Sequence, residues 1–279
     1  MPAAPSPTAS PEPDPRALAA ALDQIDRARS KPSLGPAVIG LCGAQGSGKS
    51  TLAAAMQRTL VADGARAAVL SIDDLYLTRA ERVALAHEVH PLLATRGVPG
   101  THDIGLGLAL FAALDNGQRV RLPRFDKAAD DRVPESDWPI VEQPLDVLIF
   151  EGWCVGARPQ ADAALARPVN TLEATEDRDG IWRRHANAAL AGRYRQLFAR
   201  IERLILLAAP SFAVVRRWRG EQEAALRAER PDGAALQDAA ALDRFIQHYE
   251  RLTRHILDDM PGYADLVLRL DDDRKVPPD

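Results

Sequence analysis

The sequence has few of the features that stabilise secreted proteins or anchor a protein in a membrane. It holds only two cysteines, Cys42 and Cys154, in 279 residues, so no disulfide framework is expected. No apolar run approaches the ~18 residues that a membrane-spanning helix needs. The N-terminal residues also contain no apolar core of a secretory signal. These absences favour a cytoplasmic location and argue against a membrane partner.

Net charge is also small. The formal charge is −4 at pH 7, which gives no general attraction to nucleic acids or to anionic lipid. We therefore expect no nucleic-acid partner, and any basic surface must be local. The apolar content of 46% and the charged content of 27% are typical of a globular protein. Residues 1–15 are rich in proline and alanine and are predicted to be disordered, whereas 16–279 are predicted to form one domain.

Apolar and amphipathic segments alternate along that domain. Continuous apolar runs, typical of strands that are covered on both faces, predict strands at 37–42, 67–72, 145–150, 203–208 and 265–270. Helical spacing predicts helices at 16–28, 50–63, 79–89, 103–115, 186–200, 211–229 and 239–259. This order indicates a mainly parallel sheet with right-handed crossovers, and hence a three-layer α/β/α sandwich. Two long irregular stretches, 91–103 and 121–140, are predicted to carry function.

A phosphate-binding loop follows the first predicted strand. The pattern G-x-x-x-x-G-K-[ST] is matched by Gly43, Ala44, Gln45, Gly46, Ser47, Gly48, Lys49 and Ser50, with Thr51 continuing into the helix. Glycines allow the backbone to turn its N–H groups inward, and the helix start adds its positive dipole end. Lys49 is predicted to reach the outer phosphates, and the Ser50 hydroxyl is predicted to hold Mg²⁺. The sequence therefore predicts a site for a nucleoside triphosphate and Mg²⁺. It shows the strand–loop–helix context of a P-loop NTPase.

Acidic residues follow two other predicted strands. Asp73 and Asp74 come after the strand at 67–72, and Glu151 closes the strand at 145–150. Ligands bind at the carboxyl ends of parallel strands, so these acids are expected to face the phosphate loop. Asp73 is predicted to accept a proton from an attacking hydroxyl or to bind Mg²⁺ through water, and Glu151 to organise the metal. The alternative for Asp73 and Asp74 is that they cap the next helix.

Two charged loops are candidates for the acceptor site. One spans 96–103 and includes Arg96, His102 and Asp103, and the other spans 123–132. Arginine can grip a carboxylate or a phosphate through two parallel hydrogen bonds, so the loops suggest a small anionic acceptor. The alternative is that they are solvated surface loops, in which His102 merely bonds the backbone.

Other arginines and the two thiols are weaker candidates. Arg219, beside Trp218, is a candidate lid residue over the nucleotide, although such arginines are more often solvated. Cys42 and Cys154 each lie near the end of a predicted strand, so that oxidation of either could block the site. The alternative, favoured by the usual burial of free cysteine, is a pair of inert thiols.

Together these segments resemble the D-glycerate 3-kinase family of P-loop kinases, which is related to uridine kinase, phosphoribulokinase and pantothenate kinase. The resemblance covers about residues 35–270. It rests on Gly-Ala-Gln-Gly-Ser-Gly-Lys-Ser-Thr at 43–51, Ser-Ile-Asp-Asp-Leu-Tyr-Leu-Thr at 71–78, Arg-Gly-Val-Pro-Gly-Thr-His-Asp at 96–103, Pro-Arg-Phe-Asp-Lys at 123–127, Phe-Glu-Gly-Trp at 150–153 and Trp-Arg at 218–219. The implied reaction is transfer of the ATP γ-phosphate to the 3-hydroxyl of D-glycerate.

The resemblance also implies roles for individual residues. Asp73 matches the catalytic base, with Lys49 and Glu151 as its catalytic partners. The implied metal-organising set is Ser50, Asp73 and Glu151. The resemblance carries Asp126 and Arg132 over as acceptor-binding residues, and the full acceptor-binding set predicted here is Asp73, Tyr76, Arg96, His102, Asp103, Arg124, Asp126, Lys127 and Arg132. The acceptor's carboxylate would pair with one or more of the four basic residues in that set, and the oligomeric state is left open.

Three other functions remain open at this stage. A kinase of the same branch could act on another small acceptor, such as a nucleoside, a sugar phosphate or pantothenate. A nucleotide-driven switch or motor would act on a protein partner, but neither an Asn-Lys-x-Asp guanine reader nor a Leu-Ser-Gly-Gly-Gln signature is present. A non-catalytic nucleotide-binding module would have no need to keep Lys49, Ser50, Asp73 and Glu151 together.

Overall fold

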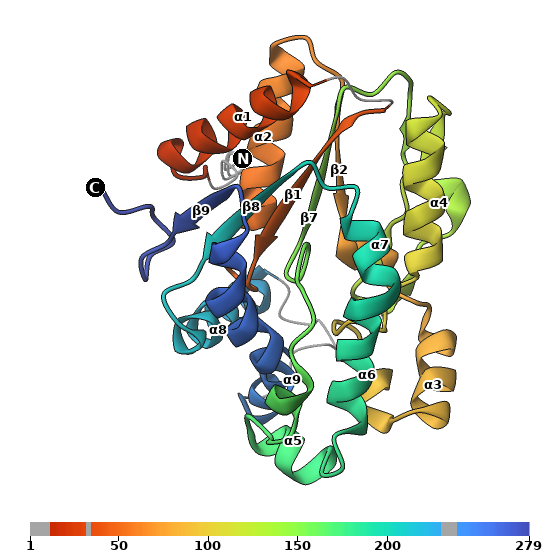
Figure 1. The fold of residues 1–279 in the computed structure, drawn as a ribbon, viewed down its shortest axis with the longest axis vertical. Helices are drawn as coiled ribbons and strands as arrows, with labels where there is room; N and C mark the ends of the chain where they lie inside the picture. Colours follow the sequence, from red (N-terminus) through yellow and green to blue (C-terminus); the bar gives the residue numbers. More distant parts are fainter. Residues whose placement is uncertain (1–11, 32–34, 230–238, 279) are drawn as a thin grey trace, which may run out of the picture.

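A five-stranded parallel sheet forms the centre of the protein (Figure 1). The computed structural model describes residues 12–31, 35–229 and 239–278. The strand order is β2–β7–β1–β8–β9, and each neighbouring pair is parallel. The strands are β1 (Ala37–Gly43), β2 (Ala67–Ser71), β7 (Val147–Gly152), β8 (Arg203–Ala208) and β9 (Leu266–Arg269). All five lie within two residues of the predicted strand bounds, and the predicted parallel sheet is confirmed.

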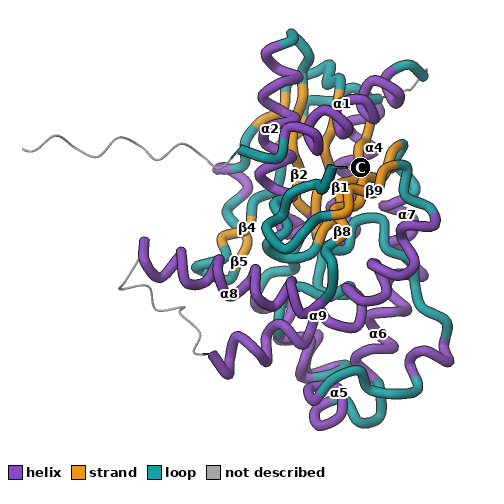
Figure 2. The backbone as a smooth tube through the Cα atoms, turned by 90° about the vertical axis from the view of Figure 1, so that its left-hand side faces the viewer, coloured by secondary structure: helices purple, strands orange, loops and turns teal. Residues whose placement is uncertain are grey.

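Helices cover both faces of this sheet. In β1, Ile39 and Leu41 pack in one apolar cluster with α1 (Pro15–Arg29) and α2 (Lys49–Ala62). Val38 and Cys42 point to the opposite face and pack in a second cluster with α4 (Ile104–Asp115) and α7 (Arg195–Phe198). This alternation follows from the two-residue period of a strand. The three-layer α/β/α sandwich is thus confirmed (Figures 1 and 2).

The remaining helices lie mainly beyond the carboxyl ends of the strands (Figure 1). They are α3 (Arg79–Glu88), α5 (Thr171–Glu176), α6 (Ile181–Ala189), α8 (Phe212–Glu229) and α9 (Ala239–Asp259). The helix predicted at 186–200 begins earlier, with α6, and is broken by a kink at Gly192 in the π-helical turn η5 (Leu190–Tyr194), beyond which α7 follows. The six-residue α5 was not predicted, since so short a segment shows no clear period.

Short elements occupy the stretches that were expected to be irregular. Residues 121–140 contribute to two small antiparallel sheets, β3 (Val120–Arg121) with β6 (Ile140–Val141) and β4 (Phe125–Asp126) with β5 (Asp131–Arg132). The 3₁₀ turns are η1 (Ile72–Leu75), η2 (Pro91–Ala94), η3 (Glu135–Asp137), η4 (Asp162–Leu165) and η6 (Met260–Gly262). These pieces give the charged loops a defined shape.

The N-terminal prediction is only partly covered by the structure. Residues 1–11 of the predicted tail lie outside the described residues. Asp14 and Pro15 are ordered as the N-cap and first residue of α1, where the Asp14 side chain accepts the Arg16 N–H. Within the ranges described, no helix combines the length and apolarity that a bilayer crossing requires.

The register of the parallel strands brings the predicted functional segments together at the carboxyl-terminal edge of the sheet. Glu151 of β7 lies beside Leu41 of β1 on one side and beside Ser71 of β2 on the other. The phosphate loop after β1 and the acids after β2 therefore flank Glu151. The site is thus a consequence of parallel strand order.

Candidate functional site

The loop between β1 and α2 has a backbone that requires glycine. Gly46 and Gly48 have φ values of 78° and 85°, in the left-handed region. A Cβ on Gly46 would lie 2.6 Å from the Cβ of Trp218 in α8. Gly48 is the N-cap of α2, whose first residue is Lys49. The unpaired N–H groups of this helix start, together with the loop, form a cradle for an anion.

Oxygen atoms suited to a divalent cation lie beside this loop. The Ser50 hydroxyl donates to Glu151 Oε1 at 3.1 Å. Glu151 is only 5% exposed, yet its Oε2 atom and Ser47 Oγ have no hydrogen-bond partner among the described residues. No cluster of three or more His, Cys, Asp or Glu side chains suited to a metal occurs in the described part of the chain. These residues fit Mg²⁺, which takes one or two protein oxygens and completes its shell with water and phosphate.

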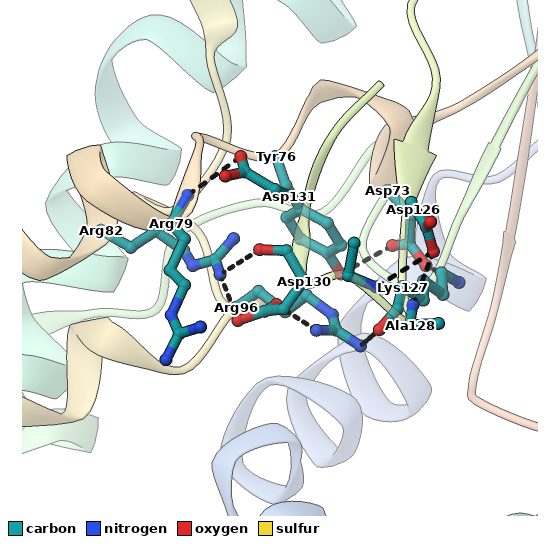
Figure 3. Close-up of polar contacts among 12 residues, drawn as sticks. Asp73, Tyr76, Arg79, Arg82, Arg96, Asp126, Lys127, Ala128, Asp130 and Asp131 are labelled. Carbon is teal, nitrogen blue, oxygen red and sulfur yellow. Dashed lines mark hydrogen bonds and ion pairs between the residues drawn. The ribbon is translucent and has the colours of Figure 1, made fainter. Parts of the chain in front are cut away.

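Asp73 lies in η1, just beyond β2, and is held by two donors (Figure 3). Lys127 Nζ donates to Asp73 Oδ2 at 2.6 Å, and the Tyr76 hydroxyl donates to Oδ1 at 2.8 Å. Burial raises the pKa of Asp73, but the charges of Lys127 and Lys49 and the two hydrogen bonds outweigh it, leaving the pKa well below its usual range. Asp73 is therefore an ionised carboxylate within electrostatic reach of the phosphate-loop lysine.

Asp74, the neighbouring acid, has a different environment. Its carboxylate accepts from Arg124 Nη1 at 3.0 Å and from the Phe125 N–H at 3.1 Å. Burial raises the pKa of Asp74, and the Arg124 charge opposes this only in part. Asp74 thus fixes the loop at 123–127 against η1, while Asp73 remains the acid that faces Lys49 and Lys127.

Arg96 belongs to a cluster that bridges the two charged loops (Figure 3). The carboxylate of Asp130 pairs with Arg96 on one oxygen and with the buried Arg82, at 2.6 Å, on the other. Arg96 Nη2 also donates to the Lys127 carbonyl at 3.2 Å. The Phe125 ring lies 5.6 Å from each guanidinium. Asp130 was not singled out from the sequence, since a lone loop aspartate carries no motif.

Four other predicted acceptor-site residues make contacts that shape the loops. Arg132 Nη2 donates to the Tyr76 carbonyl at 2.9 Å and lies 3.4 Å from Asp103. Asp103 is also the N-cap of α4. Asp126 is exposed and accepts two backbone N–H groups of its own turn. His102 is buried and bonded to Tyr194. In this structure these side chains hold the loops in place.

Helix α9 packs next to the charged loop that contains Arg96, and α8 packs against α9. Tyr249 of α9 is buried and donates its hydroxyl to the Arg96 carbonyl at 3.1 Å. Burial raises the pKa of Tyr249, and the nearby charge of Asp73 raises it further, whereas Arg96 and Arg219 lower it. Arg219 also lies over the Phe245 ring. Arg219 and Arg96 therefore approach the same tyrosine, which no sequence pattern indicated.

A C-terminal segment holds the outer side of the phosphate loop. Arg274 Nε donates to the Gly46 carbonyl at 2.6 Å, and its guanidinium lies 5.1 Å from the Trp218 ring. Trp218 Nε1 in turn donates to the Asp272 carbonyl at 2.8 Å. A cavity of about 520 Å³ lies beside this contact, and its lining includes Ser47, Gly48, Thr51, Leu52, Leu207, Leu270, Asp273, Arg274 and Lys275. It has room for a group attached to a phosphate chain.

The two cysteines are buried behind the loop. Cys42 and Cys154 have no exposed surface. Burial raises the pKa of Cys42 to about 12 and that of Cys154 well above its usual value. Because a thiol reacts as its thiolate, this environment supports the interpretation that both are inert.

Comparisons with known proteins indicate a family of kinases. The model of the phosphoribulokinase / uridine kinase family matches residues 38–156. The chain is 35% identical over 229 residues to the uncharacterized kinase mug58 of Schizosaccharomyces pombe, covering 78% of this chain and 80% of that protein. It is 32% identical over 225 residues to the chloroplastic D-glycerate 3-kinase of Arabidopsis thaliana, covering 77% of this chain but 46% of that protein.

A solved structure extends the similarity to nearly the whole chain. The D-glycerate 3-kinase of Cryptococcus neoformans var. grubii serotype A superposes with a TM-score of 0.78 at 26% sequence identity. The match covers 94% of this chain and 97% of the fungal one. The similarity therefore extends well beyond the phosphate loop.

Proposed function

The chain belongs to the phosphoribulokinase / uridine kinase family of P-loop kinases, and from that premise we propose that it transfers the γ-phosphate of ATP to the 3-hydroxyl of D-glycerate, giving 3-phospho-D-glycerate. The observation that carries this proposal is the position of Asp73, an ionised carboxylate near Lys49 that is bonded to Lys127. A base and a cation are thereby set side by side at the phosphate loop. That arrangement suits a small acceptor that carries both a hydroxyl and a carboxylate.

The nucleotide is held by the loop and by the helix start behind it. Backbone N–H groups of residues 43–51 bind the phosphates, and Lys49 stabilises the charge that develops on the transferred group. The cavity beside Thr51 and Arg274 takes the base. Ser50 and Glu151 would hold Mg²⁺, with Asp73 contributing through water. When bound, Mg²⁺ neutralises charge on the β- and γ-phosphates. Arg219 serves as a lid residue over the nucleotide.

The acceptor is oriented by residues of the two charged loops. Asp73 accepts a hydrogen bond from the 3-hydroxyl and takes its proton as the transferred group arrives. Arg96 and Lys127 bind the glycerate carboxylate. A carboxylate that draws Lys127 away removes a charge that lowers the Asp73 pKa, so acceptor binding makes Asp73 more basic. Arg124, Asp126, Arg132, Asp103, His102 and Tyr76 complete the acceptor site by holding the loops around these groups.

Residues 16–279 are proposed to act as one kinase domain, working in the cytoplasm on a small-molecule substrate. The sheet supports this, because its edge strands β2 and β9 come from segments far apart in the sequence. Limited proteolysis with and without ATP would test the domain assignment, and imaging of the tagged full-length chain would test the location. A stable fragment lacking β9 that still binds ATP would contradict the single domain.

Product identification is the decisive experiment. The enzyme is incubated with ATP, Mg²⁺ and ¹³C-labelled D-glycerate, and the phosphorylated carbon is read by ¹³C and ³¹P NMR. Coupling of phosphorus to C3 is expected. L-glycerate, uridine, ribulose 5-phosphate and pantothenate are run in parallel with labelled ATP. Phosphorylation of C2, or faster turnover of another acceptor, would overturn the proposed substrate, whereas acceptor-independent ATP hydrolysis would overturn the kinase assignment for glycerate altogether.

A further inference from the structure

Tyr194, a tyrosine of the π-helical turn η5, contacts the charged loop at 96–103. The turn η5 carries non-helical angles at Gly192, φ −95° and ψ −115°, and ends at Tyr194. These angles form a kink that separates α6 from α7. Tyr194 is only 2% exposed, and its ring packs edge-on against Phe198. The turn thus places a hydroxyl group in the protein interior.

That hydroxyl makes two hydrogen bonds to the loop at 96–103. Its oxygen accepts the Gly100 N–H at 2.9 Å and lies 2.6 Å from His102 Nδ1. A backbone N–H can only donate, so the hydroxyl proton remains available for the histidine. Among the described residues no other acceptor lies within bonding distance of this hydroxyl. Tyr194 therefore donates to His102 Nδ1, and the ring proton of neutral His102 is on Nε2.

The surroundings keep His102 neutral. It is 5% exposed, and burial lowers its pKa to about 4 although the Asp73 charge opposes that shift. At neutral pH the ring is thus uncharged. Its Nε2 atom is buried and has no hydrogen-bond partner among the described residues. A buried donor without a partner is costly unless a ligand or water completes it.

His102 is connected directly to Tyr76, whose hydroxyl donates to Asp73. The His102 and Tyr76 rings stack with centroids 4.6 Å apart and planes 25° apart. Their backbones are bridged by the Leu77 N–H to the Thr101 carbonyl at 3.0 Å and by the Asp103 N–H to the Leu75 carbonyl at 2.6 Å. A shift of the loop would therefore move Tyr76, whose hydroxyl donates to Asp73.

We propose that Tyr194 is a positioning residue that fixes the Nε2–H tautomer of His102, so that His102 donates to an oxygen of the bound acceptor while the loop holds Tyr76 against Asp73. The inference deepens the proposed function and rests on it, because Asp73 is taken as the proton acceptor. It assigns the π-helical turn a role in recognising a small, oxygen-rich acceptor. No contact between Tyr194 and the substrate is required.

Tyr194→Phe tests this role, with Tyr263→Phe as the matched control. The control removes a hydroxyl that donates to the Gly156 carbonyl at 3.1 Å, away from the acceptor loop. In Tyr194→Phe the KM for the acceptor should rise by ~10-fold, the scale for leaving buried polar groups unpaired, while the KM for ATP should change by less than about twofold. Equal acceptor KM values for the two variants would overturn the proposal.

A spectroscopic measurement tests the tautomer without substrate. In protein labelled with ¹⁵N-histidine, the ring signals of His102 are identified by their loss in His102→Gln. The wild type should show a protonated Nε2 and an unprotonated Nδ1, and Tyr194→Phe should lose this pattern. A protonated Nδ1 in the wild type would overturn the inference. If glycerate proves not to be the acceptor, the proposed substrate fails, yet this measurement still decides the tautomer.

Discussion

The nucleotide side and the acceptor side of the site differ in how far their charged side chains already pair with one another. On the nucleotide side, Glu151 Oε2 and Ser47 Oγ are buried without hydrogen-bond partners among the described residues. On the acceptor side the charges already pair with one another, as Lys127 does with Asp73 and Arg96 with Asp130. The phosphate cradle is therefore preformed, whereas an acceptor has to exchange partners with the loops.

This difference has an energetic basis. The glycine-rich loop loses conformational freedom when the protein folds. Its backbone N–H dipoles are then fixed in place and need no rearrangement when phosphate binds. Buried cations without an anion would be costly, so the acceptor loops supply aspartates that compensate the arginines. Selectivity then depends on how well the carboxylate of an acceptor replaces an aspartate of the protein as the partner of these basic side chains. The predictions below test this contrast.

The largest effect is expected from removing the groups that act on the transferred phosphate. Lys49→Ala and Asp73→Asn should each lower kcat by at least ~100-fold, the scale for losing a charge-stabilising donor or a catalytic base. Steady-state assays with ATP and D-glycerate measure this. Arg58→Ala is the control, because Arg58 lies on the same helix as Lys49 and, within the part of the chain that the structure describes, forms only an exposed pair with Glu12. Near-normal turnover of Asp73→Asn would refute its role as the base.

The next effect separates the arginines of the acceptor side. Arg96→Ala should raise the acceptor KM by about 10- to 100-fold, the scale for a lost hydrogen bond to a charged group, with the ATP KM little changed. Arg119→Ala, which breaks an exposed pair with Glu142, should behave as the wild type. If Arg132→Ala raises the acceptor KM and Arg96→Ala does not, then Arg132 binds the carboxylate instead.

Gly46 allows a test of whether the phosphate loop is already in its binding conformation, because an added Cβ there would meet Trp218. Gly46→Ala should weaken ATP binding at least ~10-fold, because the new methyl group meets Trp218 and overpacking distorts the loop. Gly64→Ala is the matched control, since Gly64 has a φ of 83° and no atom within 4 Å of the added Cβ. It should lower Tm but leave the ATP affinity, measured by calorimetry, unchanged. Equal ATP affinities would show that the loop adapts.

The smallest expected effect is a change in pH dependence. The pKa of Asp73 lies below its ordinary value of 3.8, largely because Lys127 and Lys49 oppose the effect of burial. The ionised carboxylate of Asp73 contributes its full stabilisation above pH 3.8, and this contribution is lost as the pH falls through the lowered pKa. Wild-type kcat/KM should therefore have no acid limb from Asp73 above about pH 5. Lys127→Met should move the acid limb to higher pH, because it removes a charge that lowers the pKa of Asp73. Arg124→Met, which breaks a pair with Asp74, should not, and an identical limb in both variants would contradict the Lys127–Asp73 coupling.

Local patterns in the sequence predicted the sheet and the phosphate loop. Strands such as Val147–Gly152 are continuous apolar runs, and the motif at 43–51 fixes its own backbone through Gly46 and Gly48. Asp73 and Glu151 could be placed together because parallel strands bring their carboxyl ends to one edge. These inferences needed only residues that are close in sequence and one rule of topology.

The partners within the site could not be predicted in the same way. Asp130, Tyr194 and Tyr249 are single residues from separate segments, and only packing brings them to the acceptor loops. Arg124 and Arg132 carry the charge expected of acceptor-binding residues, but tertiary contacts with Asp74 and Asp103 decide how they are used. Sequence patterns therefore indicated the chemistry of the site better than the pairing of its charges.

The contact of Arg274 with the Gly46 carbonyl links distant parts of the chain. The loop that receives ATP is completed by a segment that follows β9, the edge strand of the sheet. A chain whose β9 has not docked would have the motif but not its full shape. Nucleotide binding should accordingly select fully folded molecules and, by mass action, protect both edges of the sheet from unfolding.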